Sequence, residues 1–219
     1  MGAGSSTVAV RAGEPSSRER ILDAAEDLFA RRGYAGVGLR EVAEDVGLGK
    51  SSLFHHFPNK PELYAAVCAR ILERIDAGVA RSLARSGSAA ERFLGAIDDL
   101  VLALSRRPGD ARILLRSLFE DDDLPGESAE QKRGEAFVKR IVSRVEAVLG
   151  EGMAAGGIRR ASPRPLLLLV VGLVVFPAAS GEFGEELIRG AVQAPQNLAL
   201  IREETRRLLA QGLVIPIVG

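Results

Sequence analysis

The chain contains little of the chemistry that holds small secreted or metal-bound proteins together. Among 219 residues there is one cysteine, Cys68, no tryptophan, and only two histidines, His55 and His56. A single cysteine cannot form a disulfide within the chain, and there is no cysteine and histidine cluster for structural zinc. These absences favour a reducing, cytoplasmic setting, and we expect neither a metal nor a cofactor.

Neither sign of charge is in excess. The chain has 29 basic and 29 acidic residues, so its formal net charge is zero. A basic excess over the whole chain therefore cannot serve as evidence for nucleic acid, and local charges must decide. The 47% of hydrophobic and 26% of charged residues are typical of a folded globular protein with one core or two small ones.

Long hydrophobic runs are also missing. The most apolar stretch, Leu166–Ala179, is interrupted by Gly172 and Pro177 and is shorter than the roughly 20 residues that span a bilayer. The N-terminal residues have no apolar stretch of signal-peptide length. We therefore expect no membrane segment, and we interpret Leu166–Ala179 as a buried helix.

Apolar residues recur at helical spacing along most of the chain, without strand alternation or a fixed-period repeat. Ser16 and Glu19 fit a capping box that starts the first helix, and Gly33 ends it. We predict an all-α fold of about nine helices. Three short N-terminal helices, a long connector beginning near Lys60 and a larger helical body suggest two domains.

The most informative segment is Gly38–Phe57. It holds two short helical stretches on either side of Gly47, and glycine tolerates the positive φ that a sharp turn requires. Two helices joined by so short a turn cross steeply, as in a helix-turn-helix. In that motif the second helix enters the major groove of DNA and the first lies over the backbone.

The polar residues of this segment suit DNA. No acidic residue occurs between Asp45 and Glu62, and the same window contains Lys50, His55, His56 and Lys60. Acidic groups would repel phosphates, so a local absence of acids with cations present favours nucleic acid. Lys50, Ser51 and Ser52 open the second helix, where lysine can donate to guanine and serine can bond to either type of base pair.

At this point the chain resembles the TetR/AcrR-type regulators over residues 17–66. Their pattern of Ala-x-x-x-Gly-Val, then Thr-Leu-Tyr-x-His-Phe, then x-x-Lys appears here in three pieces. The pieces are Ala43-x-x-x-Gly47-Leu48, Ser52-Leu53-Phe54-His55-His56-Phe57 and Pro58-Asn59-Lys60. The resemblance implies a homodimer that binds a pseudo-palindromic operator on double-stranded DNA. It further implies a repressor that a small molecule releases.

The resemblance also assigns roles to residues. It implies DNA contacts from Gly38, Arg40, Lys50, Ser51, Ser52, Phe54, His55, His56 and Lys60, of which His55 is alternatively only solvated. Gly38 stands where the family has threonine or serine, which weakens the N-cap by a few tenths of a kcal/mol. Phe54 stands where the family has tyrosine, so a hydrogen bond to phosphate is lost.

The resemblance divides the chain into three parts. We expect a flexible arm over residues 1–15, a helix-turn-helix DNA-binding domain over residues 16–62, and a helical ligand-binding and dimerisation domain over residues 63–219. The helices near residues 163–179 and 195–211 are expected to pair across a two-fold axis. Because the body is aliphatic, we expect an apolar or amphipathic ligand, and the candidate pocket residues are Phe93, Leu115, Phe119, Phe137 and Phe176.

Other interpretations of the two histidines, of Cys68 and of the function fit the sequence less well. A metal site at His55 and His56 lacks a third ligand, and Cys68 is better explained as a buried structural thiol than as a redox sensor. We find no catalytic residues, because both histidines lie in the predicted DNA helix and no phosphate-binding loop is present. There are two alternatives to a DNA-binding regulator. A helical protein-interaction module leaves the acid-free window unexplained, and an enzyme in the C-terminal domain has no residue pattern that points to it.

Overall fold

The computed structural model describes residues 15–120 and 128–215, without the side chains of residues 118–120. Within those ranges the chain forms ten α-helices, and the only strand-like pairing is an isolated bridge between Ile158 and Val214. The helices are α1 (Ser17–Arg32), α2 (Leu39–Asp45), α3 (Lys50–His56), α4 (Lys60–Leu83), α5 (Ala89–Arg106), α6 (Pro108–Glu120), α7 (Ala129–Ala154), α8 (Pro163–Ala179), α9 (Gly181–Ile188) and α10 (Pro195–Leu213). The all-α prediction is confirmed. The predicted N-terminal arm lies, except for Pro15, outside the described residues.

The helix that the sequence did not predict is α9. It contains Gly181 and Gly184, and a glycine inside a helix costs about 1 kcal/mol relative to alanine. Gly184 is buried, and a Cβ at this position would overlap the side chain of Ser180. Close packing therefore explains a glycine that propensity alone treats as a helix breaker. In the same way α7 continues to Ala154, past its predicted end near Leu149, because Gly152 leaves room for Ile158.

Local signals set the start and end of α1 as predicted. The Ser16 hydroxyl accepts a hydrogen bond from the Glu19 backbone N–H at 3.2 Å, and the Glu19 carboxylate accepts one from the Ser16 N–H at 2.8 Å. Hydrogen bonds from the Ser16 backbone N–H and from the Ser16 hydroxyl to the Glu19 carboxylate lower the pKa of Glu19 below its usual value. At the other end Gly33 has φ 73°, and its N–H donates to the Phe29 carbonyl at 2.9 Å. The capping box and the glycine stop are both confirmed.

Two hydrophobic cores meet along α4. The N-terminal core combines α1, α2 and α3 with the first half of α4 and with Ile113 of α6. The second core begins at Val79 and unites α5, α7, α8 and α10, and Ile75 packs against both cores. The expected boundary between residues 62 and 63 therefore falls inside one continuous helix, which couples the two parts of the molecule mechanically.

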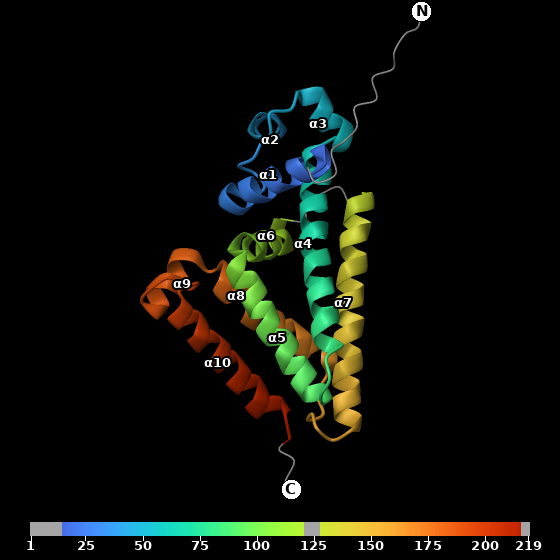
Figure 1. Ribbon diagram of the computed structural model, residues 1–219, viewed down its shortest axis with the longest axis vertical. Coiled ribbons are helices and arrows are strands. Elements are labelled where there is room, and N and C mark those ends of the chain that lie inside the picture. Colours follow the sequence, from blue (N-terminus) through green and yellow to red (C-terminus); the bar gives the residue numbers. More distant parts are fainter. Residues whose placement is uncertain (1–14, 121–127, 216–219) are drawn as a thin grey trace, which may run out of the picture.

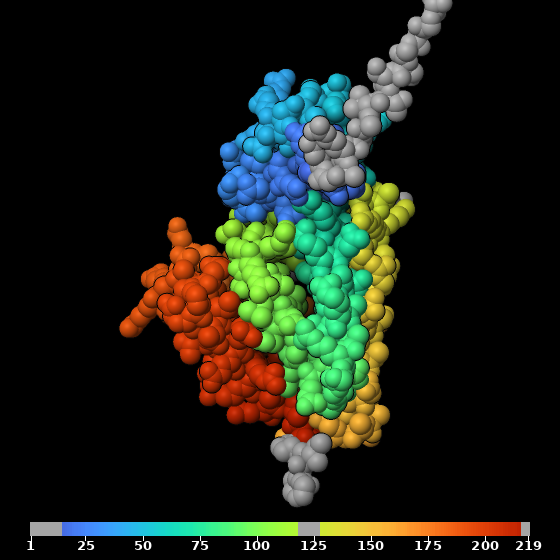
Figure 2. All heavy atoms as spheres, viewed as in Figure 1, coloured from blue at the N-terminus to red at the C-terminus, as the bar shows by residue number. Residues whose placement is uncertain are grey.

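Figure 1 shows how the helices are arranged around α4. The helices α4 and α7 lie side by side along the long axis, and α1 to α3 form the upper end of the molecule. On the side opposite α7, helices α9 and α10 form the outer edge of the body. Figure 2 shows a narrow hollow between α4 and the neighbouring α5 on the face drawn. The upper end of the molecule and this hollow are therefore the two candidate functional regions.

Of the described helices, none taken singly has both the length and the hydropathy to cross a bilayer. The pair α8 and α9 meets the criterion on length and composition together, but the two helices are bent by 90° relative to each other.

Candidate DNA-reading face and ligand cavity

The turn between α2 and α3 has the geometry that the sequence predicts. Gly47 has φ 65°, a conformation in which a side chain is strained. The Gly47 N–H donates to the Glu44 carbonyl at 3.1 Å, and the Leu48 N–H donates to the Ala43 carbonyl at 2.9 Å. These hydrogen bonds close the end of α2 within three residues of α3, so the two helices form a helix-turn-helix.

The inner side of α3 is anchored to the N-terminal core. Leu53 and Phe57 are buried, and they pack in one cluster with Val42 of α2 and with α1. The side chain of Arg20 on α1 donates to the Val46 carbonyl at the end of α2, at 2.5 Å. Because its inner side is held in this way, α3 presents a fixed outer side.

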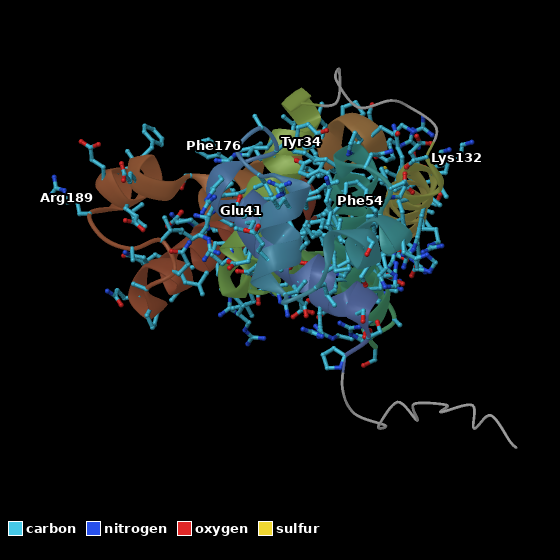
Figure 3. All side chains as sticks on the ribbon, turned by 90° about the horizontal axis from the view of Figure 1, so that it is seen from above. Tyr34, Glu41, Phe54, Lys132, Phe176 and Arg189 are labelled. Atoms are coloured by element: carbon cyan, nitrogen blue, oxygen red, sulfur yellow. The ribbon has the colours of Figure 1, made fainter. Side chains whose placement is uncertain are left out.

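That outer side carries the predicted DNA contacts. Lys50, Ser51, Phe54 and His55 are exposed, and Ser52 and His56 are half-buried. The Phe54 side chain is 37% exposed, and the Lys50 ammonium lies 5.4 Å from its ring centroid. In Figure 3, which is seen from above, Phe54 and Glu41 lie over the N-terminal helices, whereas Arg189 lies at the far edge beyond α9.

Arg40 and Lys60 flank α3, and Gly38 precedes Arg40 at the start of α2. Arg40 is exposed and makes no ion pair with a carboxylate of the described residues, including that of Glu44 one turn further along α2. The Lys60 ammonium lies 4.4 Å from the Tyr34 ring centroid, and it donates to the Ala35 carbonyl at 3.4 Å. Gly38 caps α2 without a side-chain hydrogen bond, as its lack of a hydroxyl requires.

One acidic residue of α2 is already paired. Glu41 of α2 accepts a hydrogen bond from Arg32 at the end of α1. The exposed side of α3 itself contains no acidic residue, and Lys50 has no ion-pair partner among the described residues. A polyanion that approaches α3 therefore meets cations and hydroxyls.

The body contains a cavity of about 930 Å³. Its polar lining lies at the end nearest α1 to α3, where the first turns of α4 and the N-terminal half of α7 contribute Asn59, Glu62, Ser128, Glu130, Gln131, Glu135 and Lys139, with Ser117 of α6. The remaining lining is almost entirely apolar and includes Leu72, Ile75, Val79, Leu83, Phe93, Ile97, Leu100, Val142, Val145, Leu167 and Val171. The cavity therefore has one polar end and one long apolar portion.

The predicted pocket residues are not gathered around this cavity. Phe93 lines it, and Leu115 is half-buried away from the lining. The Phe137 ring is buried beneath Arg133 and Arg140, whose guanidinium carbons lie 5.6 Å and 4.4 Å from its centroid. Phe176 is exposed and lies 6.3 Å from Phe183, centroid to centroid. The Phe119 side chain lies outside the described residues.

Aliphatic residues make up most of the lining, and, apart from the Leu166–Val175 run, which the sequence also allowed to line a pocket, they were not predicted as pocket residues. Leu72, Ile75 and Val79 continue the apolar stripe of α4, but a stripe does not indicate whether its side chains fill a core or border a cavity. Cys68 also lines the cavity, and its side chain is half-buried. Among the described residues no group of three or more metal-ligating side chains comes together, and the two histidine rings lie 5.6 Å apart.

This fold and this site define an all-α protein with an N-terminal helix-turn-helix and a cavity in a larger helical body. Residues 21–67, which include the helix-turn-helix, match the family described as bacterial regulatory proteins of the tetR family. The resemblance drawn from the sequence is confirmed.

Relatives with curated descriptions align with part of the chain. The HTH-type transcriptional activator FasR of Mycolicibacterium smegmatis is 35% identical over 81 residues, which is 37% of each protein. The HTH-type transcriptional repressor KstR of the same organism is 32% identical over 111 residues, which is 50% of this chain and 54% of KstR. The chain thus matches between a third and a little over half of these relatives' length.

Solved structures share the fold over almost the whole chain. The ketosteroid transcriptional regulator KstR2 of Mycobacterium tuberculosis has a TM-score of 0.71 at 18% identity, with 93% of this chain and 97% of that chain covered. AibR in complex with isovaleryl coenzyme A and operator DNA has a TM-score of 0.69 at 18% identity, with 87% and 96% covered. The arrangement of the body, and not only the helix-turn-helix, is therefore that of known regulators.

Proposed function

We propose that the protein is a ligand-responsive transcriptional repressor that binds a pseudo-palindromic operator as a homodimer and is released by a small molecule. The observation that carries the proposal is the outer side of α3, which is exposed, free of acidic residues and rigidly anchored from behind. In this proposal residues 16–62 read DNA, and residues 63–219 bind the ligand and dimerise. The protein acts in the cytoplasm and is not an enzyme.

The roles of the DNA-facing residues follow from their positions. Lys50, Ser51 and Ser52 stand in the first turn of α3, where side chains reach base edges in the major groove. Arg40 and Lys60, at the starts of α2 and α4, contact phosphates on either side. Gly38, Phe54, His55 and His56 complete the surface that faces the groove and the backbone.

Operator selection from random double-stranded DNA, followed by fluorescence anisotropy over a salt series, tests DNA binding. We expect a selected palindrome whose half-sites lie about 34 Å apart, with an affinity that falls as salt rises. Lys50→Glu should abolish binding and leave the dimer intact. Lys139→Glu, the same charge reversal at an exposed lysine of α7, is the matched control and should bind like the wild type. If no sequence is enriched over background, the protein is not an operator-binding regulator.

The apolar surface of α8 to α10 supports the homodimer. Leu168 and Leu169 of α8 are 73% and 71% exposed, and further large apolar side chains are exposed at Phe176, Phe183, Leu187, Leu200 and Leu208. Contiguous apolar surface of this kind marks an interface. A second copy that places its α8 and α10 against these helices would form a four-helix bundle across a two-fold axis.

Light scattering of Leu169→Glu tests the interface. The buried charge should give monomers, and these should bind the operator far more weakly because the two half-sites are no longer linked. Ala136→Glu, which places the same charge on the exposed side of α7, should remain dimeric. A Leu169→Glu protein that stays dimeric assigns the interface elsewhere.

The shape and lining of the cavity support an amphipathic ligand with an apolar chain. The long aliphatic portion would take the chain, and the polar end beneath α1 to α3 would take the head group. Two structures with the same fold, AibR and the FadR of Bacillus subtilis, are described in complex with isovaleryl coenzyme A and with stearoyl-CoA. These two complexes make acyl thioesters the first compounds to test.

Thermal shift and operator release should be measured with lauroyl-CoA, with laurate and with coenzyme A alone. We expect a compound that carries the chain to raise Tm and to weaken operator binding, and we expect coenzyme A alone to do neither. Leu100→Trp, which fills the apolar portion, should block both effects without weakening DNA binding. If none of the chain-bearing compounds raises Tm, the proposed ligand class is wrong.

A further inference from the structure

Glu130 belongs both to the cavity and to a contact with the helix-turn-helix. It lies in the first turn of α7 and lines the polar end of the cavity. Its carboxylate also accepts a hydrogen bond from Arg18 of α1, with 2.5 Å between Nη2 and Oε1, across 112 residues of sequence. The Glu130 side chain is only 17% exposed, so water screens this ion pair less than it screens a surface pair.

Arg18 in turn contacts the end of α3. Its guanidinium carbon lies 5.2 Å from the ring centroid of Phe57, the buried residue that caps α3. The Phe57 N–H donates to the Leu53 carbonyl at 2.8 Å, which closes the last turn of α3. In the same turn of α1, Arg20 holds the end of α2 through the Val46 carbonyl. The first turn of α1 therefore positions both helices of the helix-turn-helix.

Glu130 has a second hydrogen-bond partner, which belongs to α7 itself. Arg133, three residues further along the helix, donates to the other carboxylate oxygen of Glu130 at 3.4 Å. Arg133 is itself held by Glu73 of α4 at 2.6 Å. If Arg18 withdraws, Glu130 keeps a cation beside it, and its half-buried charge is not left without compensation. The carboxylate thus has two alternative arrangements, one of which includes the helix-turn-helix.

We propose that Glu130 is the positioning residue through which occupation of the cavity reaches α3. With the cavity empty, the Arg18–Glu130 ion pair holds the first turn of α1, and with it Phe57 and Val46, in the DNA-binding arrangement. A ligand head group at the polar end that bonds to Glu130, or displaces the first turn of α7, releases Arg18. Such a ligand binds the released state more tightly, and this difference in affinity is what weakens operator binding. The inference rests on the proposed function, because it describes regulation at the same cavity.

The direction in which one substitution changes operator affinity tests the proposal without any ligand. Removal of an acidic charge should tighten DNA binding if electrostatics alone acts. Glu130→Gln should instead weaken binding to the selected operator by about fivefold or more, because α3 loses its support. The matched control is Glu146→Gln, which removes a carboxylate of the same helix that pairs with Arg164 and not with α1. It should bind as tightly as the wild type or more tightly.

A charge swap distinguishes the ion pair from a general loss of stability. Arg18→Glu combined with Glu130→Arg restores opposite charges at the same two positions. The double variant should therefore recover stability beyond the sum of the single variants. Hydrogen exchange at the Phe57 amide reports the order of α3 without DNA, and exchange should be faster in Glu130→Gln than in the wild type.

The outcomes separate this inference from the proposed function. If the wild type selects no operator, the proposed function fails, and Phe57 exchange still decides whether Glu130 supports α3. If the wild type binds its operator, and Glu130→Gln binds as well or better with unchanged Phe57 exchange, the coupling role of Glu130 is overturned. Equal weakening in Glu130→Gln and Glu146→Gln would also overturn it, since the effect would then not depend on Arg18.

Discussion

Arg70 of α4 donates to the Glu26 carboxylate of α1, with 3.1 Å between Nε and Oε2, and this bond ties the first helix to the long helix. Arg74, one turn further on, donates both to Glu26 and to Asp110 of α6, at 2.8 Å and 2.9 Å. Burial by itself would raise the pKa of Glu26, but the hydrogen bond from Arg70 and the charges of Arg74 and Arg70 outweigh it and lower that pKa. Burial raises the pKa of Asp110, and Arg74 offsets this only in part. Three helices thus meet in one network of shared charges beneath the helix-turn-helix.

Glu26→Gln should destabilise the protein. The neutral amide cannot compensate Arg70 and Arg74, and hydrogen bonds to charged groups contribute about 1.5–3 kcal/mol. The Glu26 side chain is only 13% exposed, so solvent replaces little of the loss. Urea unfolding measures the free energy. Asp27→Asn, which breaks the exposed pair with Arg31 on the same helix, is the control and should cost less than about 1 kcal/mol. Equal losses in both variants would show that the network adds nothing beyond a surface pair.

Two glycine substitutions should have opposite effects on stability. A Cβ at Gly109 of α6 would lie 2.9 Å from the Cβ of Ala30 on α1, so Gly109→Ala must push the helices apart. Overpacking of this kind costs about 1–3 kcal/mol. At Gly78 of α4 the nearest side-chain atom would be 4.0 Å from a new Cβ, so Gly78→Ala should stabilise by about 0.5–1 kcal/mol. Thermal unfolding of both variants checks the sign, and a stabilising Gly109→Ala would contradict the close contact of α1 with α6.

Phe54→Tyr should strengthen operator binding. The Phe54 ring is exposed on α3, and a phenolic hydroxyl at its tip would reach a phosphate oxygen, where the family places this group. One added hydrogen bond corresponds to about threefold to tenfold in affinity. Anisotropy with the selected operator measures the change. Phe183→Tyr, at an exposed ring of α9 far from α3, should leave affinity unaltered. Weaker binding by Phe54→Tyr would indicate that the ring packs against the DNA without room for a hydroxyl.

The ion pair between Asp98 of α5 and Arg202 of α10 predicts a pH dependence. Arg202 donates two hydrogen bonds to Asp98, at 2.7 Å and 2.6 Å, and these lower the pKa of Asp98 below its ordinary value of 3.8. A carboxyl group whose pKa is lowered by folding stabilises the folded state above the unfolded pKa. That stabilisation is lost as the pH falls through the folded pKa.

Urea unfolding of the wild type and Asp98→Asn at several values of pH tests this dependence. The wild type should be the more stable protein at neutral pH, and the difference should shrink as the pH drops below 3.8. Asp99→Asn is the control on the same helix, because Asp99 pairs with Arg85 and not with α10. A difference between wild type and Asp98→Asn that stays constant with pH would mean that the charge of Asp98 does not hold α10.

Where the interactions that decide a structural feature are local, the sequence alone was sufficient to predict that feature. The capping box at Ser16 and Glu19 and the turn at Gly47 involve neighbours within five residues, so spacing and residue type predict them. The exposed outer side of α3 followed from the same logic, because the apolar residues Leu53 and Phe57 specify which side is buried. The all-α class and the helix-turn-helix were therefore determined by the sequence.

Where the deciding contacts join distant segments, only the tertiary structure could settle them. Phe93 borders the cavity while Phe137 lies beneath two arginines, and nothing in the periodicity of either helix distinguishes them. Arg18 and Glu130 meet because α1 and α7 are brought together by packing on α4, and no local pattern records which of 29 basic and 29 acidic residues will become partners.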